Sequence, residues 1–429
     1  MTETIRTVAE PSEAPATHAL RVEGLYKVFG RGAPEAVRRL QEGASRDDLP
    51  QGTTAAVIDA SFEVHPGEIF VVMGLSGSGK STLIRTLNGL LEPTAGTVEI
   101  GDALVSGASA AQLREVRRSR VSMVFQHFAL LPHRTVLENA AYALELRGVR
   151  KAERLQRAEE ALGMVGLAGW GASLPSELSG GMRQRVGLAR ALAAGTDILL
   201  MDEAFSALDP LIRKEMQDQL LELQSKLGMT IVFITHDLNE AMRLGDRIAM
   251  MRAGRIVQVG TPEDILTDPA NDYVAQFVAE VDRARVLTAS SVMERPVAVI
   301  GPEAGPRTAH RLMREHQTSS LLVVSRDRRV LGVVHEDDVA EAIRRGAEAL
   351  PRLSAREVTT VGPDTQLADL LADAAATRSP LAVVDDAGVL VGLIPRVTLL
   401  SALADPNGSG HETDAPEPDA ATDTQGGAR

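Results

Sequence analysis

Residues 74–82, GLSGSGKST, carry the clearest chemistry of the sequence. They satisfy the pattern G-x-x-x-x-G-K-[ST] and stand between an apolar run and a stretch of helical periodicity. In such a strand–loop–helix unit, backbone N–H groups wrap phosphates, the lysine reaches the β- and γ-phosphate oxygens, and the hydroxyl binds Mg²⁺. We therefore predict a site for ATP and Mg²⁺. Its residues are Gly74, Leu75, Ser76, Gly77, Ser78, Gly79, Lys80, Ser81 and Thr82, with Lys80 on the phosphates and Ser81 on Mg²⁺.

Polar side chains end three further apolar runs. Asp202 follows one run and is placed to orient the water shell of Mg²⁺, while Glu203 suits a general base for attack on the γ-phosphate. Gln126 ends a second run, where it would sense Mg²⁺ and the γ-phosphate, and His236 ends a third. Paired acids or a lone histidine are often structural, and it is their combination with residues 74–82 that favours catalysis.

A second segment, SLPSELSGGMRQRVGLARAL at 173–192, also resembles an anion site. Ser179, Gly180 and Gly181 open an amphipathic helix, and unpaired N–H groups at a helix start attract anions. One chain therefore carries two phosphate-binding patterns about a hundred residues apart, although one nucleotide needs only one.

The elements that would position these residues alternate short apolar runs with helical stretches. Buried strands are predicted at 68–75, 121–126, 197–203 and 230–236, each followed by a turn or helix signal. This alternation predicts a mostly parallel α/β core. A short helix and loop at 30–55 interrupt the first strands, and no role follows from their sequence.

Beyond this core the sequence repeats itself. Residues 320–343 align without a gap on 380–403, so that Gly332 corresponds to Gly392. Two copies of about 60 residues predict two small modules packed face to face. The predicted organisation is a disordered segment at 1–17, an ATPase domain at 18–285, the two modules at 286–404 and an acidic disordered tail at 405–429.

Bulk composition narrows the function classes. The net charge of −13 argues against a general nucleic-acid binder, and the chain has no cysteine for disulfides or thiolate metal sites. Its start is polar, unlike a secretory signal, and its apolar runs have the size of buried strands rather than membrane spans. We expect a cytosolic protein.

The motifs GLSGSGKST, VFQ, LSGGMRQR, ILLMDEAFSALD and TH stand in the order and spacing of ABC-transporter ATPase domains. The resemblance covers 18–285 and implies a P-loop NTPase with a RecA-like core, a helical signature subdomain and an antiparallel β subdomain. Such ATPases form head-to-tail homodimers in which each signature helix caps the ATP of the other chain. This arrangement explains the second anion pattern, and it implies contacts in trans from Ser179, Gly180, Gly181 and Gln184.

The resemblance also assigns single roles. Gln126 becomes the Q-loop residue, Glu203 the catalytic carboxylate, Asp209 the D-loop residue and His236 the switch histidine. An aromatic ring should stack on adenine, for which Phe29 fits the family spacing better and Tyr26 is the reserve.

Longer stretches, such as NGLLEPTAGTVEI and IVQVGTPEDIL, look like the ATP-binding subunit of glycine betaine/proline importers. The insertion at 30–55 is typical of that subfamily, and the repeat resembles its tandem CBS domains, an α/β pair. The resemblance implies a transmembrane permease, an extracytoplasmic substrate-binding protein and a peripheral location on the cytoplasmic face of the inner membrane. Nothing in the residues contacts the solute.

CBS pairs often bind adenine nucleotides through a hydroxyl and an aspartate in each copy. Of the four positions, His335, Asp338, Pro395 and Thr398, one carries the expected group, which leaves Asp338 as the possible ligand. The alternatives are a salt sensor on anionic lipid, through the arginines of 326–329 and 344–345, and a structural role alone.

Three rival functions remain open. One is an importer ATPase for another solute, such as an amino acid or a polyamine. Another is a soluble ABC ATPase acting on nucleic acid or the ribosome, which the single P-loop and the lack of a long coiled coil disfavour. The last is a purely regulatory nucleotide binder, which conflicts with the presence of Glu203 and His236.

Overall fold

The computed structural model describes residues 18–126, 128–279, 281–297, 299–350, 358–377 and 379–403. The segments 1–17 and 405–429, predicted to be disordered, lie outside these residues. The chain divides into two compact units, Met1–Val281 and Asp282–Arg429. This division falls slightly before the predicted boundary at 285, because the 3₁₀ turn η3 (Arg283–Arg285) contacts helices of the second unit.

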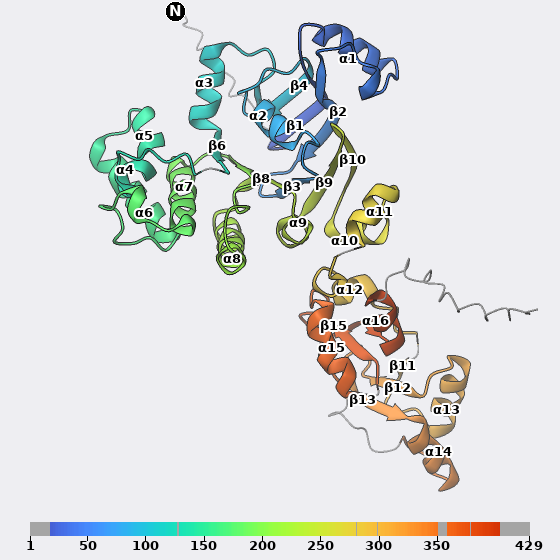
Figure 1. Ribbon diagram of the computed structural model, residues 1–429. Coiled ribbons are helices and arrows are strands. Elements are labelled where there is room, and N and C mark those ends of the chain that lie inside the picture. Colours follow the sequence, from blue (N-terminus) through green and yellow to red (C-terminus); the bar gives the residue numbers. More distant parts are fainter. Residues whose placement is uncertain are drawn as a thin grey trace, which may run out of the picture. The chain divides into compact units, whose positions relative to one another are not determined.

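A six-stranded sheet forms the centre of the first unit, in the order β10-β9-β3-β8-β7-β6 (Figure 1). Its strands are β3 (Ile69–Met73), β6 (Val121–Val124), β7 (Ile198–Asp202), β8 (Thr230–Thr235), β9 (Arg247–Arg252) and β10 (Arg255–Gly260). All neighbours pair in parallel except β9 and β10. The predicted parallel core is confirmed, and its apolar runs are strands buried on both faces.

A second, antiparallel sheet lies beside the first in the order β2-β1-β4-β5. Its strands are β1 (Leu20–Phe29), β2 (Thr54–Val64), β4 (Ala95–Ile100) and β5 (Ala103–Leu104). Helix α2 (Lys80–Leu87) contacts strands of both sheets, and Phe62 stacks on Phe70 across them at 5.0 Å between ring centroids. One hydrophobic core therefore joins the two sheets.

The predicted insertion is a helix and a 3₁₀ turn, α1 (Ala33–Gln41) and η1 (Arg46–Asp48). Its apolar side chains Ala36, Val37 and Leu40 pack on the antiparallel sheet against Tyr26 and Ile58. The insertion therefore covers one face of that sheet.

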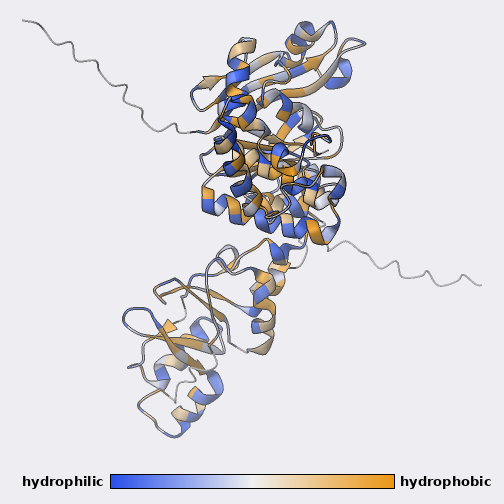
Figure 2. Cartoon of the chain, turned by 90° about the vertical axis from the view of Figure 1, so that its left-hand side faces the viewer, coloured by the Kyte–Doolittle hydropathy of each residue, from blue (hydrophilic) through white to orange (hydrophobic). Residues whose placement is uncertain are grey.

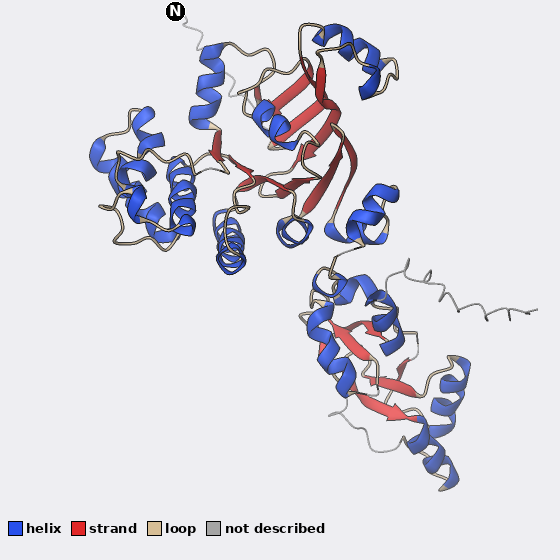
Figure 3. Cartoon of the chain, viewed as in Figure 1, coloured by secondary structure: helices blue, strands red, loops and turns tan. Residues whose placement is uncertain are grey.

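Short helices form a third part of this unit, drawn green in Figure 1. They are α4 (Val136–Ala140), α5 (Tyr142–Leu146), α6 (Lys151–Met164), η2 (Pro175–Glu177) and α7 (Gly180–Ala194). The remaining helices are α3 (Ala110–Ser119), α8 (Pro210–Leu227), α9 (Leu238–Leu244), α10 (Pro262–Thr267) and α11 (Asp272–Val278). The expected helical and antiparallel subdomains are thus both present (Figure 3).

The second unit holds two similar modules. The first has α12 (Ala289–Val292), β11 (Val299–Ile300), α13 (Pro306–Glu315), β12 (Ser320–Val324), β13 (Val330–His335) and α14 (Glu336–Arg344). The second has β14 (Thr360–Val361), α15 (Leu367–Ala376), β15 (Leu381–Val384), β16 (Leu390–Ile394) and α16 (Arg396–Leu403).

The repeat is confirmed in the strand register. Val323 pairs with Gly332 in the first module, Val383 pairs with Gly392 in the second, and a register shift follows each pair. The modules share a core of Leu322, Val333, Ala382 and Leu390, as expected for two copies packed on one another. In Figure 2 the strands of both units are coloured mainly as apolar.

Candidate functional site

The loop at 74–79 joins the carboxyl end of β3 to the start of α2 and shapes an anion cradle. Gly79, the N-cap of α2, has φ +107°, and no side chain caps the helix. A Cβ on Gly79 would lie 2.1 Å from the Ala56 carbonyl oxygen, and one on Gly74 equally close to that of Met251. Only glycine fits these positions, so backbone N–H groups line the loop and suit a phosphate.

Lys80 lies inside this loop and is 4% exposed. Its Nζ donates to the carbonyl oxygens of Gly74 at 2.8 Å and Leu75 at 3.1 Å. Burial lowers the pKa of Lys80, and the nearby carboxylates Glu203 and Asp202 oppose this shift. The ammonium group is thus held where phosphate oxygens would enter the loop.

Ser81 and Asp202 bring two oxygen donors together beside the loop. The Ser81 Oγ donates to Asp202 Oδ1 at 3.1 Å. Burial raises the pKa of Asp202, against the Ser81 hydrogen bond and the Arg85 charge. The Ser78 hydroxyl is buried and has no hydrogen-bond partner within the described part of the chain. Hard oxygen ligands beside an unpaired donor fit a phosphate and its Mg²⁺.

Three predicted residues meet at the carboxyl ends of β6, β7 and β8. Glu203 Oε2 lies 3.2 Å from His236 Nδ1 and 3.5 Å from Gln126 Nε2. Glu203 has φ +46°, an uncommon backbone conformation for a non-glycine residue, which concentrates at functional sites. A carboxylate in contact with an imidazole can accept a proton from water and have its orientation fixed by its partners.

The predicted signature residues lie on another part of the unit. Ser179 is the exposed N-cap of α7, and its side chain accepts from the Met182 N–H at 3.3 Å. Gly180 has open space around it. Figure 1 shows helix α7, which these residues begin, apart from helix α2, which follows the glycine loop.

Gln184 departs from its expected role. It is 1% exposed, and neither side-chain amide atom has a hydrogen-bond partner among the described residues. Five residues beyond Ser179 the helix has turned this side chain to the interior, away from a surface that could meet a second chain. We therefore drop Gln184 from the expected contacts in trans.

Of the two aromatic candidates, Phe29 alone is accessible. It is 40% exposed at the end of β1, with Lys27 Nζ 5.1 Å from its ring centroid. Tyr26 is buried against α1, and this burial removes the reserve candidate. Asp209 is the exposed N-cap of α8, where its Oδ1 accepts from the Ile212 N–H at 3.1 Å.

In the second unit, Asp338 is exposed in the first turn of α14. Thr398, the fourth position compared above, donates to Glu294. The sequence did not single out Ser206 or Arg213, which both contact the loops of the site. For Arg213, the sequence pattern offers one indication, its place four residues after Asp209, the N-cap of α8.

Comparisons with known proteins identify the family of each unit. Residues 57–206 match the ABC transporter family, and 289–345 and 352–405 each match the CBS domain. CbiO1 from Clostridium perfringens, part of the ABC transporter complex CbiONQ, has a similar structure. Its TM-score is 0.50 at 25% identity, over 61% of this chain and 94% of that one. These matches define the ATPase of an ABC transporter, with CBS domains attached.

Curated relatives extend over both units. The glycine betaine/carnitine transport ATP-binding protein GbuA of Listeria monocytogenes is 52% identical over 90% of this chain and 97% of its own length. The glycine betaine transport ATP-binding protein OpuAA of Bacillus subtilis is 50% identical over 90% and 93%. ProV of Escherichia coli, a glycine betaine/proline betaine transport system ATP-binding protein, is 48% identical over 90% and 97%. The chain belongs to this family of transport ATP-binding proteins, whose members are ATPases coupled to transport.

Proposed function

We propose that the chain is the ATP-hydrolysing subunit of an importer for glycine betaine, proline betaine or proline. The support is the identity of about half the residues with proteins named for this transport, over both the ATPase and the CBS units. An importer of another solute would use the same ATPase chemistry. The CBS pair favours the importer of glycine betaine, proline betaine or proline.

Hydrolysis would use the residues gathered around the glycine loop. Lys80 and the loop N–H groups bind the phosphates. Glu203 accepts the proton of a water that attacks the γ-phosphorus, with His236 and Gln126 holding this carboxylate, while the bond to ADP breaks. Ser81, Asp202 and Gln126 would hold Mg²⁺, which neutralises phosphate charge.

The second half of each site would come from another copy of the chain. Ser179 is exposed and Gly180 has open space around it, whereas Gly181 faces the Ile212 side chain; their helix α7 lies apart from α2 in Figure 1. A head-to-tail homodimer brings the start of α7 to the γ-phosphate of the partner copy, with Asp209 exposed for the same interface. Two copies then enclose two ATP molecules.

The solute pathway would belong to other polypeptides. Among the described residues no helix combines the length and apolar character of a membrane span. We place the chain on the cytoplasmic face of the membrane, beside a permease that receives solute from an extracytoplasmic binding protein.

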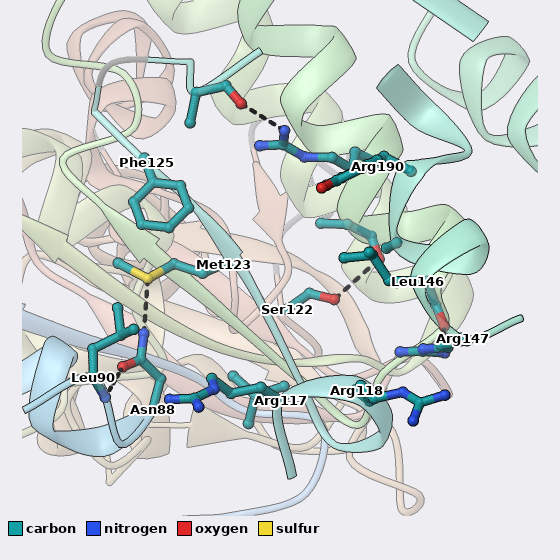
Figure 4. A pocket seen from close by; sticks show the side chains of 16 residues that line it. Asn88, Leu90, Arg117, Arg118, Ser122, Met123, Phe125, Leu146, Arg147 and Arg190 are labelled. Carbon is teal, nitrogen blue, oxygen red and sulfur yellow. Dashed lines mark hydrogen bonds between the residues drawn. The ribbon is translucent and has the colours of Figure 1, made fainter. Parts of the chain in front are cut away.

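A pocket of about 340 Å³ is the proposed contact with the permease (Figure 4). Met123, on β6, lines this pocket. Phe125, the residue just before Gln126, lines it as well. Arg190 of α7 borders the pocket and donates to the carbonyl oxygens of Ala129, at 2.7 Å, and Phe128, at 3.3 Å. An occupant would therefore press on the segment that holds Gln126.

The charge of this pocket indicates what it would receive. Arg117, Arg118 and Arg147 also line it, beside the apolar side chains of Leu90 and Leu146. A short permease helix with an apolar face and an acidic side chain complements this lining. ATP binding would then change the position of such a helix.

The experiment uses the full chain with Glu203→Gln, which removes the base and keeps the shape of the site. This variant should bind ATP, hold the closed dimer and lose turnover. We would purify it with ATP from gently solubilised membranes and identify the co-purifying polypeptides by mass.

A multi-span permease with a betaine-type binding protein would support the proposal. A different binding protein would overturn the solute and keep the mechanism. Recovery from the soluble fraction with ribosomes, nucleic acid or no partner would overturn the transport function. Wild-type turnover in the Glu203→Gln variant would contradict the role of this carboxylate, and Glu215→Gln, an exposed change on α8, is the matched control.

A further inference from the structure

The two loops that carry Glu203 and His236 leave neighbouring strands, β7 and β8. Their side chains touch at 3.2 Å, yet both loops are polar and partly exposed. An ATPase that must place an attacking water needs this separation fixed to within a fraction of an ångström. A further contact that spans the two loops would provide this constraint.

Arg213, in the first turns of α8, makes such a contact. Its Nη2 donates to the carbonyl oxygens of Leu208 at 3.1 Å and Ser206 at 3.5 Å, both in the loop that follows Glu203. Its Nη1 lies 3.3 Å from Oδ2 of Asp237, the residue after His236. The planar guanidinium thereby holds one loop through neutral carbonyls and the other through a charge.

These contacts close a ring around the reacting groups. The Ser206 hydroxyl donates to the Glu203 carbonyl oxygen at 2.9 Å, and Gln126 Nε2 lies 3.4 Å from the same hydroxyl. From Glu203 the ring runs through Ser206, Arg213 and Asp237 to His236, which contacts Glu203 again. Each member is thus held from two directions.

A separate buried network holds the helices beneath this ring. Glu240 of α9 is 5% exposed and accepts from Gln217 Nε2 of α8 at 3.0 Å and from the Thr235 hydroxyl. Arg213 takes part in none of these hydrogen bonds. The association of α8 with α9 should therefore survive its replacement, while the loops above become loose.

We propose that Arg213 is a positioning residue for ATP hydrolysis, which keeps the Glu203 carboxylate in register with His236 through the Ser206, Leu208 and Asp237 contacts. The inference rests on the proposed ATPase activity. Asp209, which caps α8, is expected at the dimer interface, so Arg213 on this helix also connects that interface to the Glu203–His236 pair. Arg213 itself does not touch ATP.

The test is steady-state hydrolysis by the full chain with Arg213→Ala and Arg213→Lys. We expect kcat of the alanine variant to fall at least about tenfold, while KM for ATP stays within about twofold because the glycine loop is unchanged. Lysine should restore part of kcat, since an ammonium can pair with Asp237 but lacks the fork that reaches both carbonyls. Lys214→Ala, the exposed neighbour, is the control and should match the wild type.

A second variant separates positioning from folding. Asp237 caps α9 by accepting from the Glu240 N–H at 3.2 Å, and asparagine caps a helix equally well. Asp237→Asn therefore removes the charge and keeps the helix start. If Arg213 acts through Asp237, the double variant should be little slower than Arg213→Ala alone.

Unchanged kcat in Arg213→Ala, or fully additive losses in the double variant, would overturn the inference. So would a rise in KM that accounts for the whole loss. If thermal melting shows that Arg213→Ala is not folded, Arg213→Lys and Asp237→Asn provide the same comparison. A wild-type chain without ATPase activity, at subunit concentrations high enough to form the homodimer, would instead refute the proposed function.

Discussion

The Lys80 side chain is held in position by the glycine loop that precedes it. Its ammonium is buried and hydrogen-bonded to two carbonyl oxygens of the glycine loop. These bonds satisfy a charge that would otherwise be costly to bury. Phosphate oxygens entering the loop would add negative charge in direct contact with this ammonium.

Lys80→Ala should remove charge-assisted contacts that contribute about 1.5–3 kcal/mol to phosphate binding. We expect hydrolysis to be abolished, as measured by phosphate release, and ATP affinity to fall in equilibrium binding. Lys226→Ala is a matched control, because that side chain is exposed and pairs with the exposed Glu222 on α8. Retained turnover in Lys80→Ala would refute the assigned nucleotide site.

At this scale, residue type and local pattern predict which residues form the site, and their roles stay predictions. The positions of Lys80, Ser81, Asp202 and Glu203 follow from short motifs beside apolar strands, and the structure brings Glu203 to His236. Gln184 was misplaced, because its burial depends on how α7 packs, which no local motif records. Arg213 was missed because its partners lie in two loops that meet only in the folded chain.

At the scale of elements, the parallel sheet collects residues that lie far apart in the sequence. Strands β3, β6, β7 and β8 end at one edge, so their following loops meet there. The apolar runs sufficed to predict these strands and therefore this edge. The packing of α1 on the antiparallel sheet was not predicted. The apolar spacing of this nine-residue helix shows which of its faces is buried but not which sheet it contacts.

Helix α5 offers a test of the proposed permease contact. Leu146, at its end, is 59% exposed and lines the pocket of Figure 4. Leu146→Asp should leave ATP hydrolysis by the isolated chain unchanged, because this side chain lies outside the catalytic loops. It should weaken assembly with the permease and reduce solute uptake, because the aspartate removes an apolar contact and adds a negative charge that repels the acidic side chain expected on the docked helix.

Met164→Asp provides the control for this experiment. Met164 is an exposed apolar residue on α6 that does not line the pocket. Assembly measured by co-purification should be normal for Met164→Asp and reduced for Leu146→Asp. Equal assembly of both variants would contradict the docking site.

At the scale of the whole molecule, the CBS unit adds charge that a salt-dependent contact can use. Arg326, Arg328, Arg344 and Arg345 are exposed on its first module. Attraction between such residues and anionic lipid weakens as salt shortens the Debye length to about 8–10 Å. We propose that this contact makes transport respond to ionic strength.

Replacing these four arginines with glutamine should flatten the salt dependence of uptake by the complete transporter in vesicles with anionic lipid. Arg311→Gln with Arg314→Gln, exposed on α13, is the control for charge at another place on the same module. Unchanged salt dependence in the fourfold variant would contradict lipid contact through these residues. The same variant should behave like the wild type in vesicles without anionic lipid.

The separation of α7 from α2 within one chain has a kinetic consequence. A site completed by a second copy forms in a bimolecular step, so the specific activity of the free subunit should rise with its concentration. A permease that holds two copies side by side would raise their effective concentration to about 10⁻³ M, as short tethers do. Assembly on the membrane would then itself switch on hydrolysis, and unassembled subunits would consume little ATP.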